Sequence, residues 1–186
     1  MYYHCSPIGG LTCLQPSKPR NFDKPSLVYM TTSLPMALMY GIRNFEYTYG
    51  YSKAGQIYYE EYFPDALRQL YAGKSAYLYE CQPQITETTT IPNEVVSPLP
   101  VEILRETYVP DVLQALLEQE RLGALTICRY KQLSPQTREW IFRAEMEEIR
   151  KRDLLHTPGP MADYIRLHYP EVWSAAIVQQ KKAPED

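Results

Sequence analysis

Long apolar segments and an excess of basic charge are both missing from this sequence. No apolar run approaches the ~20 residues that a membrane-spanning helix needs, and the opening MYYHCSPIGG lacks the basic and apolar regions of a secretory signal. The formal net charge is −3, so the chain carries no broad basic field for sequence-independent binding to nucleic acid. We therefore expect a protein of the cytoplasm with no membrane partner.

Paired cysteines and the commonest catalytic motifs are also absent. The four cysteines form no CxxC pair and have no histidine at metal-ligand spacing, which predicts free thiols and no metal site. They are Cys5, Cys13, Cys81 and Cys128. The sequence contains no GxGxxG, GxxxxGKS/T, GxSxG or HExxH. The chain therefore lacks the familiar sequence signatures of Rossmann domains, P-loop enzymes, serine hydrolases and zinc proteases.

What the chain does contain is the composition of a globular protein with an unusual number of tyrosines. Of its 186 residues, 45% are hydrophobic, 22% are charged and 17 residues are tyrosine. Many of the tyrosines crowd into residues 47–63, YTYGYSKAGQIYYEEYF. Each ring is apolar with a polar tip, so this segment favours strands and amphipathic pockets and offers flat surfaces to planar ligands.

The first part of the chain, up to about residue 103, predicts short strands with two helices among them. Clusters of proline, glycine and serine bound the strands. They are predicted at 2–5, 27–31, 56–63, 75–82, 85–90, 94–96 and 99–103, with a short element at 11–14. One helix, capped by Thr32 or Ser33, extends to Ile42, and a second ends at Gly73. Strands and helices do not alternate regularly, so the pattern is α+β.

The last part of the chain predicts helices only. Four helix starts are marked by turn and capping residues, at Pro110-Asp111, Ser134-Pro135, Pro158-Gly159-Pro160 and Pro170-Glu171. These helices are too short and mixed to be stable alone, so we expect them to pack on the first domain. The sequence therefore predicts one domain at 1–107 and a helical extension at 108–186.

Within this extension the second helix has one apolar stripe among many charges. The stripe consists of Trp140, Ile141, Ala144 and Ile149. We interpret the helix as a packing helix with a solvated face, and His156 and His168 as surface residues.

Three segments of the first domain each place one polar side chain on or beside a predicted strand. They are YYHCS with His4, LVYMTTSLPMALMYG with Tyr29, and IPNEVVSPLPV with Glu94. Together with the opening YYHCSPIGGLTCLQPS, they resemble the ADP-ribosyltransferase superfamily of the His-Tyr-Glu type over about residues 1–104. In that family a first strand carries a histidine, a later strand carries a tyrosine just before a helix, and a third carries a glutamate.

The resemblance implies an α+β fold with a small split, mixed or antiparallel β-sheet that binds NAD. It also implies an NAD-dependent mono-ADP-ribosyltransferase, which cleaves the nicotinamide glycosidic bond and transfers ADP-ribose to an acceptor. The sequence leaves that acceptor open as a protein, a nucleic acid or a small molecule. No metal is implied.

The resemblance assigns catalytic roles to His4, Tyr29 and Glu94. His4 would hydrogen-bond a ribose hydroxyl of NAD and Tyr29 would stack on the nicotinamide ring. Glu94 would bind the hydroxyl of the nicotinamide ribose and orient the acceptor. A carboxylate suits this position because the glycosidic bond breaks through an oxocarbenium-like state, which nearby negative charge stabilises. Other carboxylates compete for that role, namely Glu80, Glu87 and Glu102.

Further cofactor-binding positions follow from the same resemblance. Cys5 occupies the place where the family often has a glycine whose backbone grips the nicotinamide amide. Ser6 would help to hold the first strand and the nicotinamide, and Tyr40 would form the opposite wall of the pocket. Neighbouring strand residues point to opposite faces, so Cys5 and His4 cannot form a nucleophile and base pair, and Cys5 is interpreted as buried packing.

Two alternatives stay open at this point. An RNA 2′-phosphotransferase of the same superfamily needs several arginines for phosphates, whereas Arg20, Arg43 and Arg68 are sparse and scattered, which disfavours it. A non-catalytic module of the same fold would act through its tyrosine-rich surface or its helical extension in binding a protein partner. Cys5 at the glycine position favours this second alternative.

Overall fold

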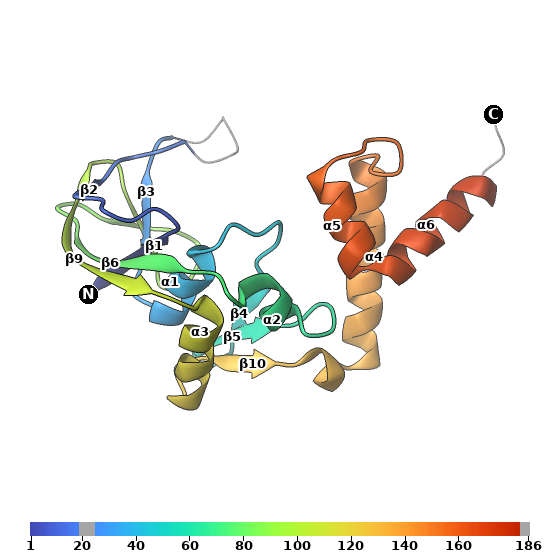
Figure 1. The fold of residues 1–186 in the computed structure, drawn as a ribbon, viewed down its shortest axis with the longest axis horizontal. Coiled ribbons are helices and arrows are strands. Elements are labelled where there is room, and N and C mark those ends of the chain that lie inside the picture. Colours follow the sequence, from blue (N-terminus) through green and yellow to red (C-terminus); the bar gives the residue numbers. More distant parts are fainter. Residues whose placement is uncertain (19–24, 183–186) are drawn as a thin grey trace. The chain divides into compact units, whose positions relative to one another are not determined.

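A computed structural model describes residues 1–18 and 25–182 of the chain (Figure 1). Arg20 lies outside the described residues. The chain divides into two compact units, the first formed by 1–59 and 67–127 and the second by 60–66 and 128–186. The domain boundary predicted after Thr107 falls inside a strand, β9 (Val101–Val109). Helix α3 (Val112–Arg121) belongs to the first unit, where it packs against α1 (Leu34–Tyr40).

The first unit is an α+β fold built on a seven-stranded sheet whose neighbouring strands run antiparallel. The order across the sheet is β2-β9-β6-β1-β3-β8-β7. Besides β9, its strands are β1 (Tyr2–Ser6), β2 (Cys13–Leu14), β3 (Val28–Thr31), β6 (Ala76–Gln82), β7 (Glu87–Thr88) and β8 (Glu94–Ser97). The strands predicted from the sequence in these regions are confirmed, although β9 is longer than the predicted 99–103 and β7 is shorter than the predicted 85–90.

A smaller three-stranded sheet has the order β10-β5-β4, with β4 at Tyr49–Tyr51, β5 at Ile57–Glu60 and β10 at Thr126–Cys128. The sequence analysis predicted β5 but neither of its neighbours. Each of these is only three residues long, and Gly50 at the centre of β4 lowers its strand propensity. Their conformation therefore depends on pairing with β5 rather than on local preference.

The two short helices predicted in the first unit are confirmed, and the first of them has clear local causes. In α1, the Ser33 side chain accepts a hydrogen bond from the Met36 backbone N–H, and Pro35 occupies the first turn. The helix contacts β1, β3 and β6, and its residues from Pro35 to Met39 are buried. The second helix is α2 (Ala66–Tyr71), and Gly73 follows it with a φ of +66°. Helix α1 thus covers one face of the sheet.

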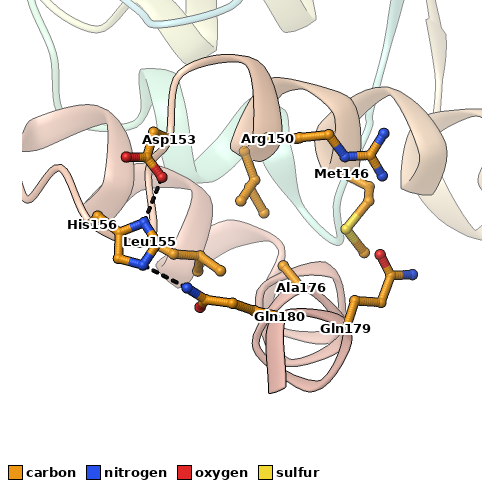
Figure 2. Close-up of a pocket in the computed structure, with 9 residues that line it drawn as sticks. Met146, Arg150, Asp153, Leu155, His156, Ala176, Gln179 and Gln180 are labelled. Carbon is orange, nitrogen blue, oxygen red and sulfur yellow. Dashed lines mark hydrogen bonds and ion pairs between the residues drawn. The ribbon is translucent and has the colours of Figure 1, made fainter. Parts of the chain in front are cut away.

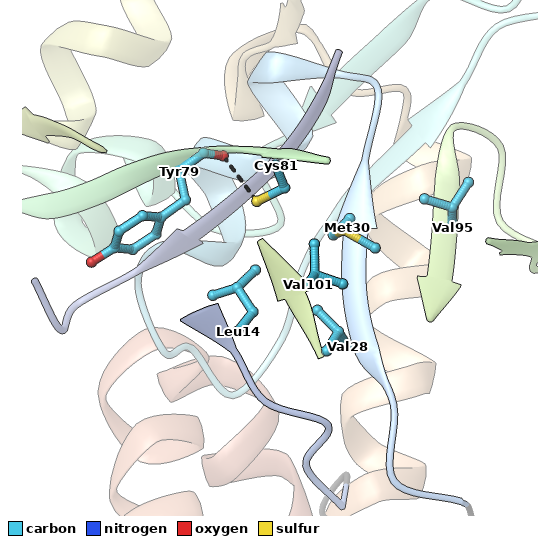
Figure 3. Packing of buried hydrophobic residues seen from close by; sticks show 7 residues of the cluster. All are labelled: Leu14, Val28, Met30, Tyr79, Cys81, Val95 and Val101. Carbon is cyan, nitrogen blue, oxygen red and sulfur yellow. Dashed lines mark hydrogen bonds between the residues drawn. The ribbon is translucent and has the colours of Figure 1, made fainter. Parts of the chain in front are cut away.

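The opposite face of the sheet carries a compact hydrophobic core (Figure 3). Its buried members come from five strands and are Leu14, Val28, Met30, Tyr79, Cys81, Val95 and Val101. Strands β2 and β8 stand far apart in the strand order, yet both contribute to this one cluster. The sheet is therefore curled, and an isolated bridge between Ser17 and Leu27 brings the chain after β2 beside the start of β3.

The second unit consists mainly of three helices, α4 (Pro135–Lys151), α5 (Pro160–His168) and α6 (Pro170–Lys182), and α6 contacts both others. Helix α4 buries Ile141 and Ile149, as its apolar stripe predicted. Trp140 is different, since 55% of its surface is exposed and its ring meets Tyr62 edge-on.

The expectation for two histidines of this unit can also be compared with the structure. His156 is exposed, as expected. The expectation that His168 is a surface residue is wrong, because its ring is half-buried and stacks on Phe63 at 4.3 Å. None of the helices in the described ranges has both the length and the apolar character to span a bilayer. All four cysteines carry free thiols.

Candidate functional site

The candidate site lies where β1 and β3 separate. Over the described residues, the ladder between these strands is the single pair Tyr3↔Thr31, whereas β1 pairs with β6 along its whole length. Next to that pair, a side chain links the two strands: Nδ1 of His4 forms a hydrogen bond with the carbonyl oxygen of Tyr29 at 2.9 Å. The sheet is thus split at two of the residues singled out from the sequence, and a side-chain hydrogen bond bridges the split.

This hydrogen bond sets the chemistry of the imidazole. A carbonyl oxygen only accepts, so Nδ1 of His4 donates its proton. Burial lowers the pKa of His4 from the usual value of 6.5, and the bond to the Tyr29 carbonyl opposes this only in part. His4 is therefore neutral near pH 7, and its Nε2 carries a lone pair. No described residue donates a hydrogen bond to this Nε2, so it is available to a ligand hydroxyl.

Two cavities open on either side of the split. One, of about 150 Å³, is lined from β1 by Tyr3, His4 and Cys5, from β3 by Tyr29, Met30 and Thr31, and from α1 by Met36, Ala37 and Tyr40. The other, of about 360 Å³, lies beside the loop after β1 and the start of β3. His4 and Tyr29 line both cavities. No lysine or arginine among the described residues lines either one.

The structure therefore brings together four of the residues assigned from the resemblance, namely His4, Cys5, Tyr29 and Tyr40, around the smaller cavity. Ser6 ends β1 outside both linings, and its Oγ accepts a hydrogen bond from the Ile8 backbone N–H. That contact turns the chain away from the strand.

Glu94 lies on β8, the strand next to β3, opposite Thr31. Paired residues of antiparallel strands project from the same face, and the row Tyr3, Thr31 and Glu94 crosses β1, β3 and β8. Glu94 lines neither cavity, but it belongs to the face on which Tyr3 and Thr31 line the smaller one. Thr89 fixes its carboxylate, because the Thr89 hydroxyl donates to Glu94 Oε1 at 2.8 Å.

The other carboxylates considered from the sequence differ from Glu94 in their pairing or their exposure. Glu80 is on β6 and forms an ion pair with Arg105 at 3.5 Å. Glu87 and Glu102 are exposed on β7 and β9. Glu80 lies opposite Tyr3 and Glu94 lies opposite Thr31, and both of these partners line the smaller cavity. Of the two carboxylates, Glu80 is paired with Arg105, whereas Glu94 forms no ion pair with a described residue.

Cys5 supports the site as a packing residue. Burial raises the pKa of its thiol to about 12, so it is no nucleophile at neutral pH. A methyl group built on Gly41, just after α1, would lie only 2.5 Å from Cys5 Sγ. The thiol thus fills the space between β1 and the end of α1, and glycine at 41 permits that approach. The interpretation of Cys5 as buried packing is confirmed.

Sequence reasoning missed the anchor of the loop after β1. The Tyr79 hydroxyl lies 2.8 Å from both the Ile8 carbonyl oxygen and Glu106 Oε2, and the same Oε2 accepts the Gly10 backbone N–H at 2.6 Å. Tyr79 is fully buried, and its ring lies 6.5 Å from that of His4. Tyr79 is 71 residues away from Ile8 and Glu106 is 96 residues away from Gly10, so the sequence carried no local signal for this anchor.

A further cavity, of about 310 Å³, lies within the second unit between α4, the segment after it, and α6 (Figure 2). At its edge His156 Nδ1 lies 2.6 Å from Asp153 Oδ1, and His156 Nε2 lies 2.5 Å from Gln180 Nε2. Its lining residues include no serine, threonine or cysteine that this histidine could activate. The interaction fastens α6 to the chain that follows α4.

Within residues 1–18 and 25–182, no three ligating side chains are grouped so as to hold a metal ion. Comparison of the chain with protein-family models, with curated proteins and with solved structures found no match.

Proposed function

We propose that the chain is an NAD-dependent mono-ADP-ribosyltransferase and that its split sheet is of the ADP-ribosyltransferase type. The observation that carries the proposal is the hydrogen bond from His4 to the Tyr29 carbonyl at the split, beside a cavity that both residues line. In addition, the strands that carry His4, Tyr29 and Glu94 are consecutive neighbours in the sheet, β1-β3-β8. Three segments distant in sequence are therefore neighbours in one sheet, with His4 projecting from one face and Glu94 from the other.

The sizes of the cavities agree with a dinucleotide of which only part is enclosed. Cavities for whole drug-sized ligands measure about 300–1,000 Å³, whereas the one under Tyr40 measures about 150 Å³. That volume suits a single ring such as nicotinamide. Tyr29, Tyr40 and Cys5 are among the residues that line it.

The charge of the site favours a cation. The nicotinamide ring of NAD is a pyridinium, which tyrosine faces attract through their negative quadrupole. Burial raises the pKa of Tyr40, and the negative charge of Glu94 raises it further. The electrostatic field of the Glu94 carboxylate therefore reaches Tyr40, which lines the smaller cavity. With no lysine or arginine in the linings of the described residues, nothing there repels this ring.

The residues then take distinct roles. Neutral His4 accepts a hydrogen bond from a ribose hydroxyl at Nε2 while Nδ1 stays bound to Tyr29. Tyr29 and Tyr40 orient the nicotinamide ring. Glu94 stabilises the positive charge that develops on the ribose as the glycosidic bond breaks, and nicotinamide departs as a neutral base with the bonding electrons. The acceptor then forms its bond to the same ribose carbon.

Nicotinamide release from NAD tests this proposal most directly. We expect slow release by the purified wild-type chain, and a fall of at least about a hundredfold in Glu94→Gln, with NAD affinity nearly unchanged. Glu87→Gln is the matched control, because Glu87 is exposed on the neighbouring strand β7, and it should release nicotinamide at the wild-type rate.

Three outcomes would separate this proposal from its alternatives. Equal turnover by wild type and Glu94→Gln would remove Glu94 from its role. NAD binding in calorimetry without any nicotinamide release would identify a non-catalytic module. The absence of both binding and release, with a range of acceptors present, would overturn the proposal. The phosphotransferase alternative stays disfavoured, because Arg43 and Arg68 line neither cavity.

A further inference from the structure

Four tyrosines of the first unit form one connected group next to the smaller cavity, which we call the tyrosine cluster: Tyr40, Tyr47, Tyr49 and Tyr51. Tyr40 and Tyr47 stack with ring centroids 4.4 Å apart, and Tyr49 meets Tyr40 edge-on at 6.0 Å. Tyr49 also meets Tyr51 edge-on at 6.2 Å, and the hydroxyls of Tyr40 and Tyr49 lie 3.1 Å apart. Tyr40 is the member that also lines the cavity.

The tyrosine cluster adjoins Glu94 through a short chain of contacts. The hydroxyls of Tyr51 and Thr31 both approach the sulfur of Met36, each at 3.3 Å, and Thr31 is the ladder partner of Glu94. Burial raises the pKa of Tyr51, whereas Asn93, directly before Glu94, lowers it. The cluster and the proposed catalytic carboxylate therefore share one side of the sheet.

The tyrosine cluster lies beside a carboxylate, Glu94, whose negative charge no described cation neutralises in an ion pair. Glu94 forms no ion pair with any described residue, and only the Thr89 hydroxyl donates to its side chain. Burial raises the pKa of Tyr49 and Tyr51, and the charge of Glu94 contributes in the same direction. A half-buried carboxylate beside tyrosine faces attracts a cation, through both the charge and the ring quadrupoles.

Among biological cations, the guanidinium group fits best. It is planar, more weakly hydrated than an ammonium group, and stacks on aromatic faces while donating hydrogen bonds to a carboxylate in its own plane. A lysine ammonium would lose more hydration on entering this half-buried surface.

We infer that the acceptor of ADP-ribose is an arginine side chain of a protein, with its guanidinium bound on the tyrosine cluster beside Glu94. This inference rests on the proposed transferase function. In the transfer, a guanidinium nitrogen forms a bond to the ribose carbon as the bond from that carbon to nicotinamide breaks. Nicotinamide leaves neutral with the electron pair, and the proton lost by the guanidinium passes to Glu94 and then to water. No oxidant or reductant is needed.

The test compares acceptors that differ in charge but not in shape. Blocked arginine, blocked citrulline, blocked lysine, blocked glutamate and a nucleoside are each incubated with the chain and NAD. Mass spectrometry measures the ADP-ribosylated product, and free nicotinamide is measured in the same samples. We expect product on arginine at roughly tenfold or more the rate on citrulline, since citrulline keeps the planar end but lacks the charge.

Variants of the cluster supply the second arm. Tyr49→Leu should raise the KM for blocked arginine roughly five- to thirtyfold, with little change in the rate of nicotinamide release to water. Tyr49→Phe keeps the aromatic ring, so its KM for blocked arginine should be close to that of the wild type. Tyr58→Leu is the matched control, because Tyr58 pairs with Gly50 and projects from the opposite face of the small sheet. NMR titration with blocked arginine gives a binding readout that needs no turnover.

The outcomes are distinguishable from those of the proposed function. Nicotinamide release with equal product on arginine and citrulline, or with more product on lysine, glutamate or the nucleoside, overturns this inference while the transferase stands. Arginine binding that Tyr49→Leu leaves unchanged also overturns it. Lack of any nicotinamide release, on the other hand, overturns the proposed function and this inference with it.

Discussion

The Nδ1 atom of His4 lies 2.9 Å from the backbone carbonyl oxygen of Tyr29, and this contact replaces the ladder hydrogen bonds at the point where β1 leaves β3. A buried carbonyl needs a donor, and no strand provides one there. His4 therefore has a structural role as well as the proposed binding role, and the two can be measured separately.

Replacing His4 by alanine should lower the free energy of unfolding by about 1–3 kcal/mol, because the Tyr29 carbonyl loses its donor. Urea denaturation followed by circular dichroism measures the change. The control is His156→Ala in the second unit, whose loss should be within about 1 kcal/mol because its contacts with Asp153 and Gln180 are exposed to water. Equal losses in the two variants would contradict the assigned role of the His4 bond.

Acid should destabilise the first unit through His4. Its pKa is lowered in the folded state, chiefly by burial, from the 6.5 typical of an unfolded chain. Above pH 6.5 neither state binds the proton and His4 contributes nothing to the pH dependence. As pH falls below 6.5, the unfolded state takes up a proton before the folded state does, so stability falls by at most about 1.4 kcal/mol per pH unit.

Unfolding in urea at a series of pH values between 7.5 and 5 checks this dependence. His4→Asn provides the comparison, since it has no titrating ring, and its stability should fall less steeply over the same range. Parallel curves for the two proteins would show that other groups cause the effect.

Gly41→Ala should destabilise the fold, although alanine is the better helix former. The φ of Gly41 is −62°, so backbone strain plays no part. The added methyl group would lie 2.5 Å from Cys5 Sγ, and such overpacking costs about 1–3 kcal/mol. Cys5→Ala removes that sulfur, so the double variant should lose less stability than the sum of the two single variants.

That double-mutant cycle has a clear negative result. Additive losses would mean that the sulfur is not what excludes a methyl group at 41. Ala76 Cβ and the Leu38 carbonyl oxygen, at 3.1 and 3.2 Å, would then be the responsible contacts.

The loop after β1 should loosen when its anchor is removed. In Glu106→Ala the Gly10 N–H loses its acceptor, so we expect its amide hydrogen exchange, measured by NMR, to accelerate at least about tenfold. Glu102→Ala is the control, because Glu102 is exposed on the same strand. Unchanged protection at Gly10 would show that the loop is held by other contacts.

Thr89 should act as a positioning residue for Glu94. Thr89→Val removes the hydroxyl that donates to Glu94 Oε1 at 2.8 Å, while its shape is kept. If the proposed function holds, kcat for nicotinamide release should fall roughly three- to tenfold with KM for NAD nearly constant. Thr90→Val, at the exposed neighbour, should leave both constants unchanged. A matching fall in Thr90→Val would assign the effect to the loop in general.

The sequence by itself determined the elements that local chemistry specifies. The strand at Tyr2–Ser6 ends at a Ser-Pro turn, and α1 begins where Ser33 caps it and Pro35 pre-sets the first turn. The four C-terminal helices begin at or within a residue or two of the predicted positions, because capping and turn residues act over a few neighbours only.

Only the tertiary structure decided which of these elements meet. The order β1-β3-β8, the split bridged by His4, and the choice of Glu94 over Glu80 depend on pairings between residues far apart in the chain. Strand β4 has little local preference and forms through its pairing with β5, and in doing so places Tyr49 and Tyr51 beside Tyr40. The tyrosines could be counted in the sequence, but their grouping next to one carboxylate is a property of long-range packing.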